Sequence, residues 1–209
     1  MSYRAVLLDI DGVLTVSWRA LTAATADYLR LAHAGKRCYL LTSGDVDTEF
    51  HCVELASQGE PADVVVMGGA GIEFSHDALN HAYRLLSKGA ALVAMHRNLF
   101  WQTGDGLTLD AGAYIDALEH ASGACATVIG KPSRAFYDDV LAKLGVAAGD
   151  AVMVGDDLVT DVQGAQGAGI PAVLVRTGKF RQESFEQSSI KPEAIIDSIV
   201  ALPAWLAGR

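Results

Sequence analysis

The chain has 209 residues, a formal net charge of −9 and a sequence pI near 5.0. Hydrophobic residues make up 51% and charged residues 20%, which excludes a disordered chain and suits one sizeable α/β unit, or a core domain with a smaller inserted one. The negative charge and the lack of a Lys and Arg run argue against nucleic acid as a partner.

The cysteine pattern and the apolar runs indicate the cellular setting. Cys38, Cys52 and Cys125 form no C-x-x-C pair, and an odd number at wide spacing argues against a disulfide framework. Charges interrupt the N-terminal stretch MSYRAVLLDIDG, and no later stretch approaches the ~18 apolar residues of a membrane span. We therefore expect a cytoplasmic protein without export or membrane insertion.

The first third of the chain predicts a β-α-β arrangement. Residues 5–10 form a short apolar run that ends in D-G, as expected of a buried strand followed by a turn. Residues 22–34 place apolar side chains at helical spacing between a Thr that can cap the helix and a Gly that can end it. The segment CYLLTSGD is again an apolar run that ends in small polar residues, which indicates a second strand.

The alternation of strands and helices continues to the end of the chain. Strands are expected in ADVVVMGGAG, ALVAMH, ATVIGKP, AVMVGDD and PAVLVRTG, and helices near 76–87, within 107–122, at 133–144 and in VTDVQGAQGAG. Such alternation predicts an α/β fold with a Rossmann-like, doubly wound, mostly parallel sheet. Ligands of such sheets bind outside the carboxyl ends of the strands.

Ionisable residues fall at the expected carboxyl ends of three separate strands. Asp9 and Asp11 end the first strand, Lys131 follows another, and Asp156 and Asp157 end a third. Carboxylates brought together without a counter-ion repel one another, and a divalent cation relieves that repulsion. Hard oxygen ligands with no His or Cys cluster favour Mg²⁺ over Zn²⁺, and Mg²⁺ accepts phosphate oxygens as further ligands. The pattern therefore predicts phosphoryl transfer to or from a small phosphorylated substrate.

The residues of this edge suit distinct chemical roles. Asp9 is the expected in-line nucleophile, which would form and then release an aspartyl phosphate. Asp11 is the expected general acid/base, and Lys131 would stabilise the charge on the transferred phosphoryl group. Asp157 and Asp161 either cap the helix that follows them or support the metal ligands.

The segments LLDIDGVL, GKPSRAFYDDVLAKLG and VMVGDDLVTDVQGAQGAG resemble the first, third and fourth motifs of the haloacid dehalogenase superfamily. Further segments, among them MHRNLFW, GLTLDAGAYIDALEHA and LVRTGKFR, resemble its subclass IIA, in which a large α/β cap is inserted after the second motif. The resemblance implies an Mg²⁺-dependent phosphatase, with residues 1–22 and 126–209 as the core and 23–125 as the cap. It implies metal binding by Asp9, Asp11 and Asp156, phosphate binding by Lys131, and a homodimer through the cap. Asp161 is a further candidate for the metal site.

The second motif of the family, a strand that ends in Thr or Ser, has two interpretations here. Thr42 and Ser43 follow a strand at a suitable distance from Asp9, so Ser43 is the candidate phosphate ligand. Alternatively, KRCYLLTSGDVDTEF belongs to the cap, and the chain lacks a core segment that contains the true second motif. In that case a catalytically impaired binding or scaffold protein is the rival to the phosphatase, while the fourth-motif acids disfavour a metal-free dehalogenase.

Overall fold

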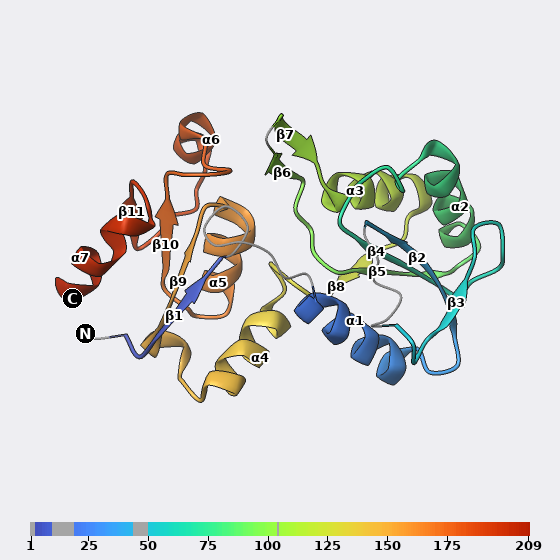
Figure 1. Ribbon diagram of the computed structural model, residues 1–209, viewed down its shortest axis with the longest axis horizontal. Coiled ribbons are helices and arrows are strands. Elements are labelled where there is room, and N and C mark those ends of the chain that lie inside the picture. The colour runs from blue at the N-terminus through green and yellow to red at the C-terminus, as the bar shows by residue number, and fades with distance from the viewer. Residues whose placement is uncertain (1–2, 10–18, 44–49, 104) are drawn as a thin grey trace. The chain divides into compact units, whose positions relative to one another are not determined.

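The computed structural model describes residues 3–9, 19–43, 50–103 and 105–209, without the side chains of 19–24 and 102 (Figure 1). The chain divides into two compact units: residues 1–16 with 131–209, called unit 1, and residues 17–130, called unit 2. The sequence had placed this division after residues 22 and 125. Each unit is built around its own parallel sheet.

Unit 1 contains a four-stranded parallel sheet in the order β1-β9-β10-β11. Its strands are β1 (Ala5–Leu8), β9 (Ala151–Gly155), β10 (Ala172–Val175) and β11 (Ala194–Ile196). Its helices are α4 (Arg134–Leu144), α5 (Gly164–Gly167), α6 (Gln182–Gln187) and α7 (Leu202–Ala207). A π-helical segment, Leu158–Gln163, runs directly into α5.

The strands of unit 1 differ in how deeply they are buried. All residues of β9 and β10 are buried, because apolar clusters cover both faces of the sheet, one around Tyr137 and the other around Leu202. Strand β1 is equally apolar but pairs only with β9 among the described strands, and Val6 is 39% exposed. The strand that precedes Asp9 is therefore the edge of this sheet as far as its strands are described.

Unit 2 contains a five-stranded parallel sheet in the order β3-β2-β4-β5-β8 and a separate antiparallel hairpin. The sheet strands are β2 (Arg37–Thr42), β3 (Glu54–Ala56), β4 (Val64–Gly68), β5 (Ala91–Ala94) and β8 (Ala126–Val128). The hairpin pairs β6 (Phe100–Thr103) with β7 (Gly106–Leu109). The helices are α1 (Arg19–Ala32), α2 (His76–Leu86) and α3 (Ala111–Ser122).

Local sequence signals explain where the helices of unit 2 begin and end. The Ser75 side chain accepts a hydrogen bond from the Ala78 backbone N–H at the start of α2, and Asp110 accepts one from Ala111 at the start of α3. Helix α3 ends at Gly123, whose φ of 76° is costly for residues with a side chain.

The prediction of an α/β fold with parallel strands is confirmed. The sequence did not predict β3, β6, β7, α6, β11 or α7, which are all short. Among the described residues, no helix combines the length and apolarity that crossing a bilayer requires.

Strand β2 decides where Thr42 and Ser43 lie. It pairs with β3 and β4, and the register sets Thr42 beside Gly68. Ser43 follows directly and donates its backbone N–H to the Gly68 carbonyl. Both residues therefore end a strand of the unit 2 sheet and do not extend the sheet that contains β1.

Candidate active site

The carboxyl ends of β1 and β9 place acids side by side in unit 1. The two strands are parallel with Leu8 beside Val154, so Asp9 and the Asp156–Asp157 pair emerge at the same edge. Asp161 lies four residues after Asp157, inside the π-helical segment, and is 0% exposed. The sequence thus folds locally so that three buried carboxylates face one small region.

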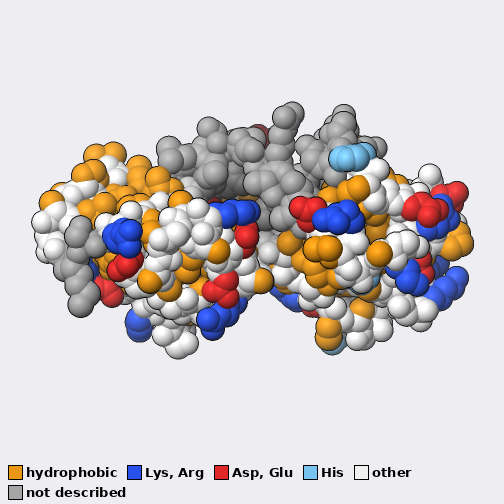
Figure 2. All heavy atoms as spheres, turned by 90° about the horizontal axis from the view of Figure 1, so that it is seen from below, with side chains coloured by type: hydrophobic (Ala, Val, Ile, Leu, Met, Phe, Trp, Pro, Cys, Tyr) orange, Lys and Arg blue, Asp and Glu red, His pale blue; other side chains and the backbone are white. Residues whose placement is uncertain are grey.

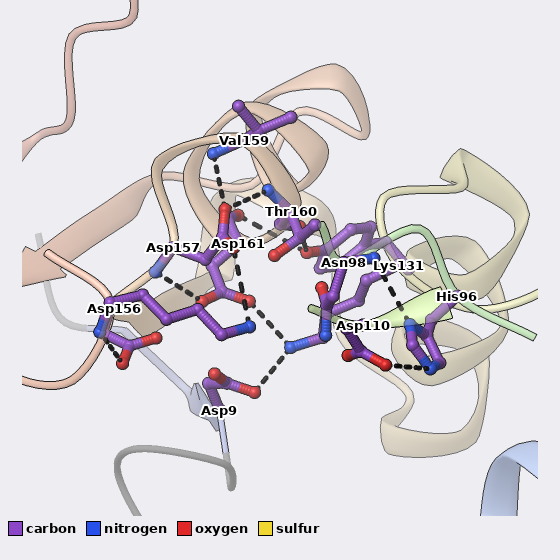
Figure 3. A network of polar contacts seen from close by, with 12 residues as sticks. Asp9, His96, Asn98, Asp110, Lys131, Asp156, Asp157, Val159, Thr160 and Asp161 are labelled. Carbon is purple, nitrogen blue, oxygen red and sulfur yellow. Dashed lines mark hydrogen bonds and ion pairs between the residues drawn. The ribbon is translucent and has the colours of Figure 1, made fainter. Parts of the chain in front are cut away.

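Lys131 links two of these acids (Figure 3). Its Nζ donates to Asp9 Oδ1 at 2.5 Å and to Asp161 Oδ1 at 2.7 Å. Charge-assisted hydrogen bonds of this length are among the strongest in proteins. The ammonium therefore holds Asp9 and Asp161 in fixed orientations relative to each other.

Asp156 offers an unused oxygen to the same region. Its Oδ2 accepts the backbone N–H of Lys179 at 2.8 Å, while its Oδ1 is buried and has no hydrogen-bond partner among the described residues. One carboxylate oxygen from each of Asp9, Asp156 and Asp161 lies within 4.8 Å of the other two. A buried carboxylate oxygen without a donor is costly, and a hard divalent cation satisfies it. The donor set therefore fits Mg²⁺.

Asp157 has a structural role, as one of the two interpretations expected. Its Oδ1 accepts the backbone N–H groups of Val159 and Thr160, both at 2.9 Å, and so caps the π-helical segment. Asp161 does not cap in this way, because its Oδ2 instead accepts the Asp157 backbone N–H at 3.0 Å. This bond ties the cap residue to the carboxylate that Lys131 holds.

Two residues shape the space around Asp161. A Cβ at Gly155 would lie 2.2 Å from Asp161 Oδ2, so only glycine leaves room for the carboxylate behind β9. The hydroxyl of the buried Tyr137 donates to the Thr160 carbonyl at 2.7 Å, which links the residue before Asp161 to α4. The position of Asp161 thus depends on neighbours from β9 and α4.

Burial and mutual charge shift the pKa values of this cluster. Burial raises the pKa of Asp156 to about 6. The hydrogen bond from the Lys179 N–H lowers this pKa, and the negative charge of Asp9 raises it further. Burial also raises the pKa of Asp161, although Lys131 opposes the increase. For Lys131, burial disfavours the charge, but Asp161 and Asp9 outweigh it and hold the pKa above its ordinary value. The acids are thus poorly compensated without a cation.

The structure brings together four of the six predicted site residues. Asp9, Lys131, Asp156 and Asp161 meet in unit 1, and their chemical roles stay predictions. Asp11 lies outside the described residues, and Ser43 belongs to unit 2, so its role in phosphate binding also stays a prediction.

Sequence reasoning missed Lys179, which contacts both Asp156 and Asp157. The signal was present in LVRTGKFR, where Lys179 follows the carboxyl end of β10, the same edge that carries the acids.

Known proteins resemble this chain in sequence. The HAD-hydrolase-like family matches residues 128–202. Phospholysine phosphohistidine inorganic pyrophosphate phosphatase from Homo sapiens is 37% identical over 171 residues, which cover 81% of this chain and 62% of that protein. The Mus musculus protein of the same name is 36% identical over 201 residues, covering 92% and 73%. The chain therefore spans less than two thirds of the human relative.

The fold resembles solved phosphatases. The structure of a 4-nitrophenylphosphatase from Thermotoga maritima superposes with a TM-score of 0.74 at 28% identity, covering 88% of this chain and 70% of that one.

Proposed function

Because the chain belongs to the haloacid dehalogenase-like hydrolase family, we propose that unit 1 is a catalytic core that hydrolyses a small phosphorylated substrate with Mg²⁺ as cofactor. Unit 2 is then the inserted cap. The observation that carries the proposal is the buried cluster of Asp9, Asp156 and Asp161 with Lys131 hydrogen-bonded to two of its members.

In this proposal Asp9 and Asp11 share the chemistry. An Asp9 carboxylate oxygen attacks phosphorus, the bond from phosphorus to the leaving group breaks, and Asp11 protonates the departing atom. Asp11 then takes a proton from a water molecule, which attacks the aspartyl phosphate and releases inorganic phosphate with Asp9 restored. Lys131, fixed by Asp9 and Asp161, stabilises the negative charge of the phosphoryl oxygens in both transition states.

The metal-binding set in the proposal is Asp9, Asp11, Asp156 and Asp161, and Asp161 also accepts a hydrogen bond from Lys131. The unpartnered Oδ1 of Asp156 is the oxygen best suited to bind the cation. A bound Mg²⁺ supplies neutralisation of the acids and polarisation of a phosphoryl oxygen.

The names of the relatives guide the choice of substrates. They point to phosphoamides such as phospholysine and phosphohistidine, to inorganic pyrophosphate, and to 4-nitrophenyl phosphate as a general probe. Nucleic acid is not an expected substrate, because the chain carries a formal net charge of −9. On the face shown in Figure 2, basic and acidic side chains are interspersed over the described parts.

The proposal includes a cytoplasmic homodimer formed through unit 2. The β6–β7 hairpin exposes large apolar side chains, with Leu107 49% and Leu109 56% exposed, and such patches favour association. Sedimentation velocity of the parent chain and of a Leu107→Lys, Leu109→Lys variant would test it, because the dimer requires a species of twice the mass that the variant loses.

One observation favours the rival, a binding protein with impaired catalysis. Strand β2, with Thr42 and Ser43 at its end, pairs within the unit 2 sheet, and β1 is the edge of the described unit 1 sheet. A strand that ends in Ser or Thr beside β1 is therefore absent from the described part of unit 1. This rival predicts Mg²⁺ binding without turnover.

A phosphatase screen separates the two functions. The parent chain is assayed with Mg²⁺ against 4-nitrophenyl phosphate, pyrophosphate and a phosphoamide, with EDTA as the metal-free control. The proposal expects turnover that EDTA abolishes and that Asp9→Asn removes, while Asp138→Asn on the exposed face of α4 retains it. If the parent chain turns over none of these substrates but binds Mg²⁺ in calorimetry, it is a binding protein with impaired catalysis.

A further inference from the structure

Lys179 is a buried cation that the proposed chemistry does not use. It follows β10 in a turn that contains Gly178, whose φ is 52°. Its backbone N–H holds Oδ2 of Asp156, and its side chain is only 6% exposed. Both ends of the residue therefore lie against the pair of acids that follows β9.

The ammonium of Lys179 is poorly satisfied. Its contact is an ion pair with Asp157 Oδ2 at 3.6 Å, too long for a hydrogen bond, and its Nζ donates to no described residue. Lys131, by contrast, makes two short bonds to carboxylates. An ammonium has three N–H donors, so that of Lys179 can still donate hydrogen bonds to an acceptor from outside the chain.

The charge balance indicates what kind of acceptor fits. Four described acids, Asp9, Asp156, Asp157 and Asp161, face Lys131 and Lys179, so the cluster carries two negative charges in excess when all are ionised. One divalent cation brings the balance of these described groups to zero.

We propose that Lys179 is a specificity-determining residue whose ammonium binds the second phosphoryl group of a phosphoanhydride substrate. This inference rests on the proposed function of the site. Lys131 is hydrogen-bonded to Asp9 and in the proposal binds the phosphoryl group that is transferred. Lys179 instead contacts Asp156 through its backbone N–H and Asp157 through its ammonium. A phosphomonoester has one charged phosphoryl group and does not need the second cation, but a diphosphate has two.

The test measures binding rather than turnover. Calorimetry with Mg²⁺ present compares imidodiphosphate, which mimics a diphosphate and resists hydrolysis, with inorganic phosphate. The variants are Lys179→Met and Lys179→Arg, each of which keeps the backbone N–H that holds Asp156. Lys143→Met is the matched control, because Lys143 is an exposed lysine of unit 1 paired with Asp139.

The expected result is a selective loss. Lys179→Met weakens imidodiphosphate binding about tenfold or more and phosphate binding less than about threefold, as the loss of one charge-assisted hydrogen bond implies. Lys179→Arg restores part of the affinity, and Lys143→Met matches the parent.

Equal losses for both anions, unchanged imidodiphosphate binding, or a weaker affinity for Mg²⁺ alone would each overturn the inference, because they indicate a structural role. A chain that turns over no phosphate ester yet shows the selective loss would refute the proposed hydrolysis and leave the role of Lys179 standing.

Discussion

Replacing Asp156 with Asn should stabilise metal-free unit 1 at neutral and alkaline pH. Burial raises the pKa of this carboxyl from 3.8 to about 6, so the folded protein binds the proton more tightly than the unfolded chain does. Stability from this group is fully present below about pH 4 and is lost as pH rises to about 6. The variant cannot ionise and so escapes that loss.

The pKa difference sets the magnitude. At ~1.36 kcal/mol per pKa unit, ionised Asp156 costs metal-free unit 1 about 3 kcal/mol at pH 8 and about 1 kcal/mol at pH 4.5. The Asn amide oxygen can still accept the Lys179 N–H that Oδ2 accepts now, so this bond is retained. The variant should therefore exceed the parent in stability by up to these amounts.

Amide hydrogen exchange of the buried strands β9 and β10 reports on unit 1 alone. Parent and variant are compared in EDTA at each pH, which cancels the intrinsic pH dependence of exchange. Asp138→Asn is the exposed control and should match the parent. Added Mg²⁺ should protect the parent and not Asp156→Asn. A variant that exchanges faster than the parent at pH 8, or a difference that is the same at both pH values, would refute the electrostatic reasoning.

Two further substitutions probe the packing and charge of the cluster. Gly155→Ala forces a Cβ against Asp161 Oδ2 and should destabilise unit 1 by about 1–3 kcal/mol in chemical denaturation, whereas Gly149→Ala meets nothing within 4 Å and should be near neutral. Lys131→Met leaves two buried carboxylates without their shared cation, so kcat should fall by about a hundredfold or more and metal-free stability should drop by about 3–5 kcal/mol. Near-parent values of both kcat and unfolding free energy for Lys131→Met would contradict that role.

The sequence by itself determined the strand ends that carry the chemistry. Apolar runs that stop at Asp9 and Asp156 predicted parallel strands with acids at one edge, and the register of β1 and β9 confirms this. The run before Lys131 is also a strand, but β8 pairs with β5 in the unit 2 sheet, so the expectation that Lys131 ends a third strand of the same sheet is wrong. Asp161 could be predicted in the same way, because it lies four residues after Asp157 in the segment VMVGDDLVTD.

Only the tertiary structure decided which sheet each strand joins. Strand β2 has the same kind of apolar sequence as β1, and strand pairing depends on contacts between distant segments that a linear pattern does not encode. The different roles of Asp157 and Asp161 were likewise decided by tertiary structure. Asp157 accepts hydrogen bonds from Val159 and Thr160 and caps the helical segment, whereas the buried Asp161 accepts one from Lys131. Lys179 was missed for this reason as well, since its importance comes from a neighbouring strand that places its backbone N–H against Asp156.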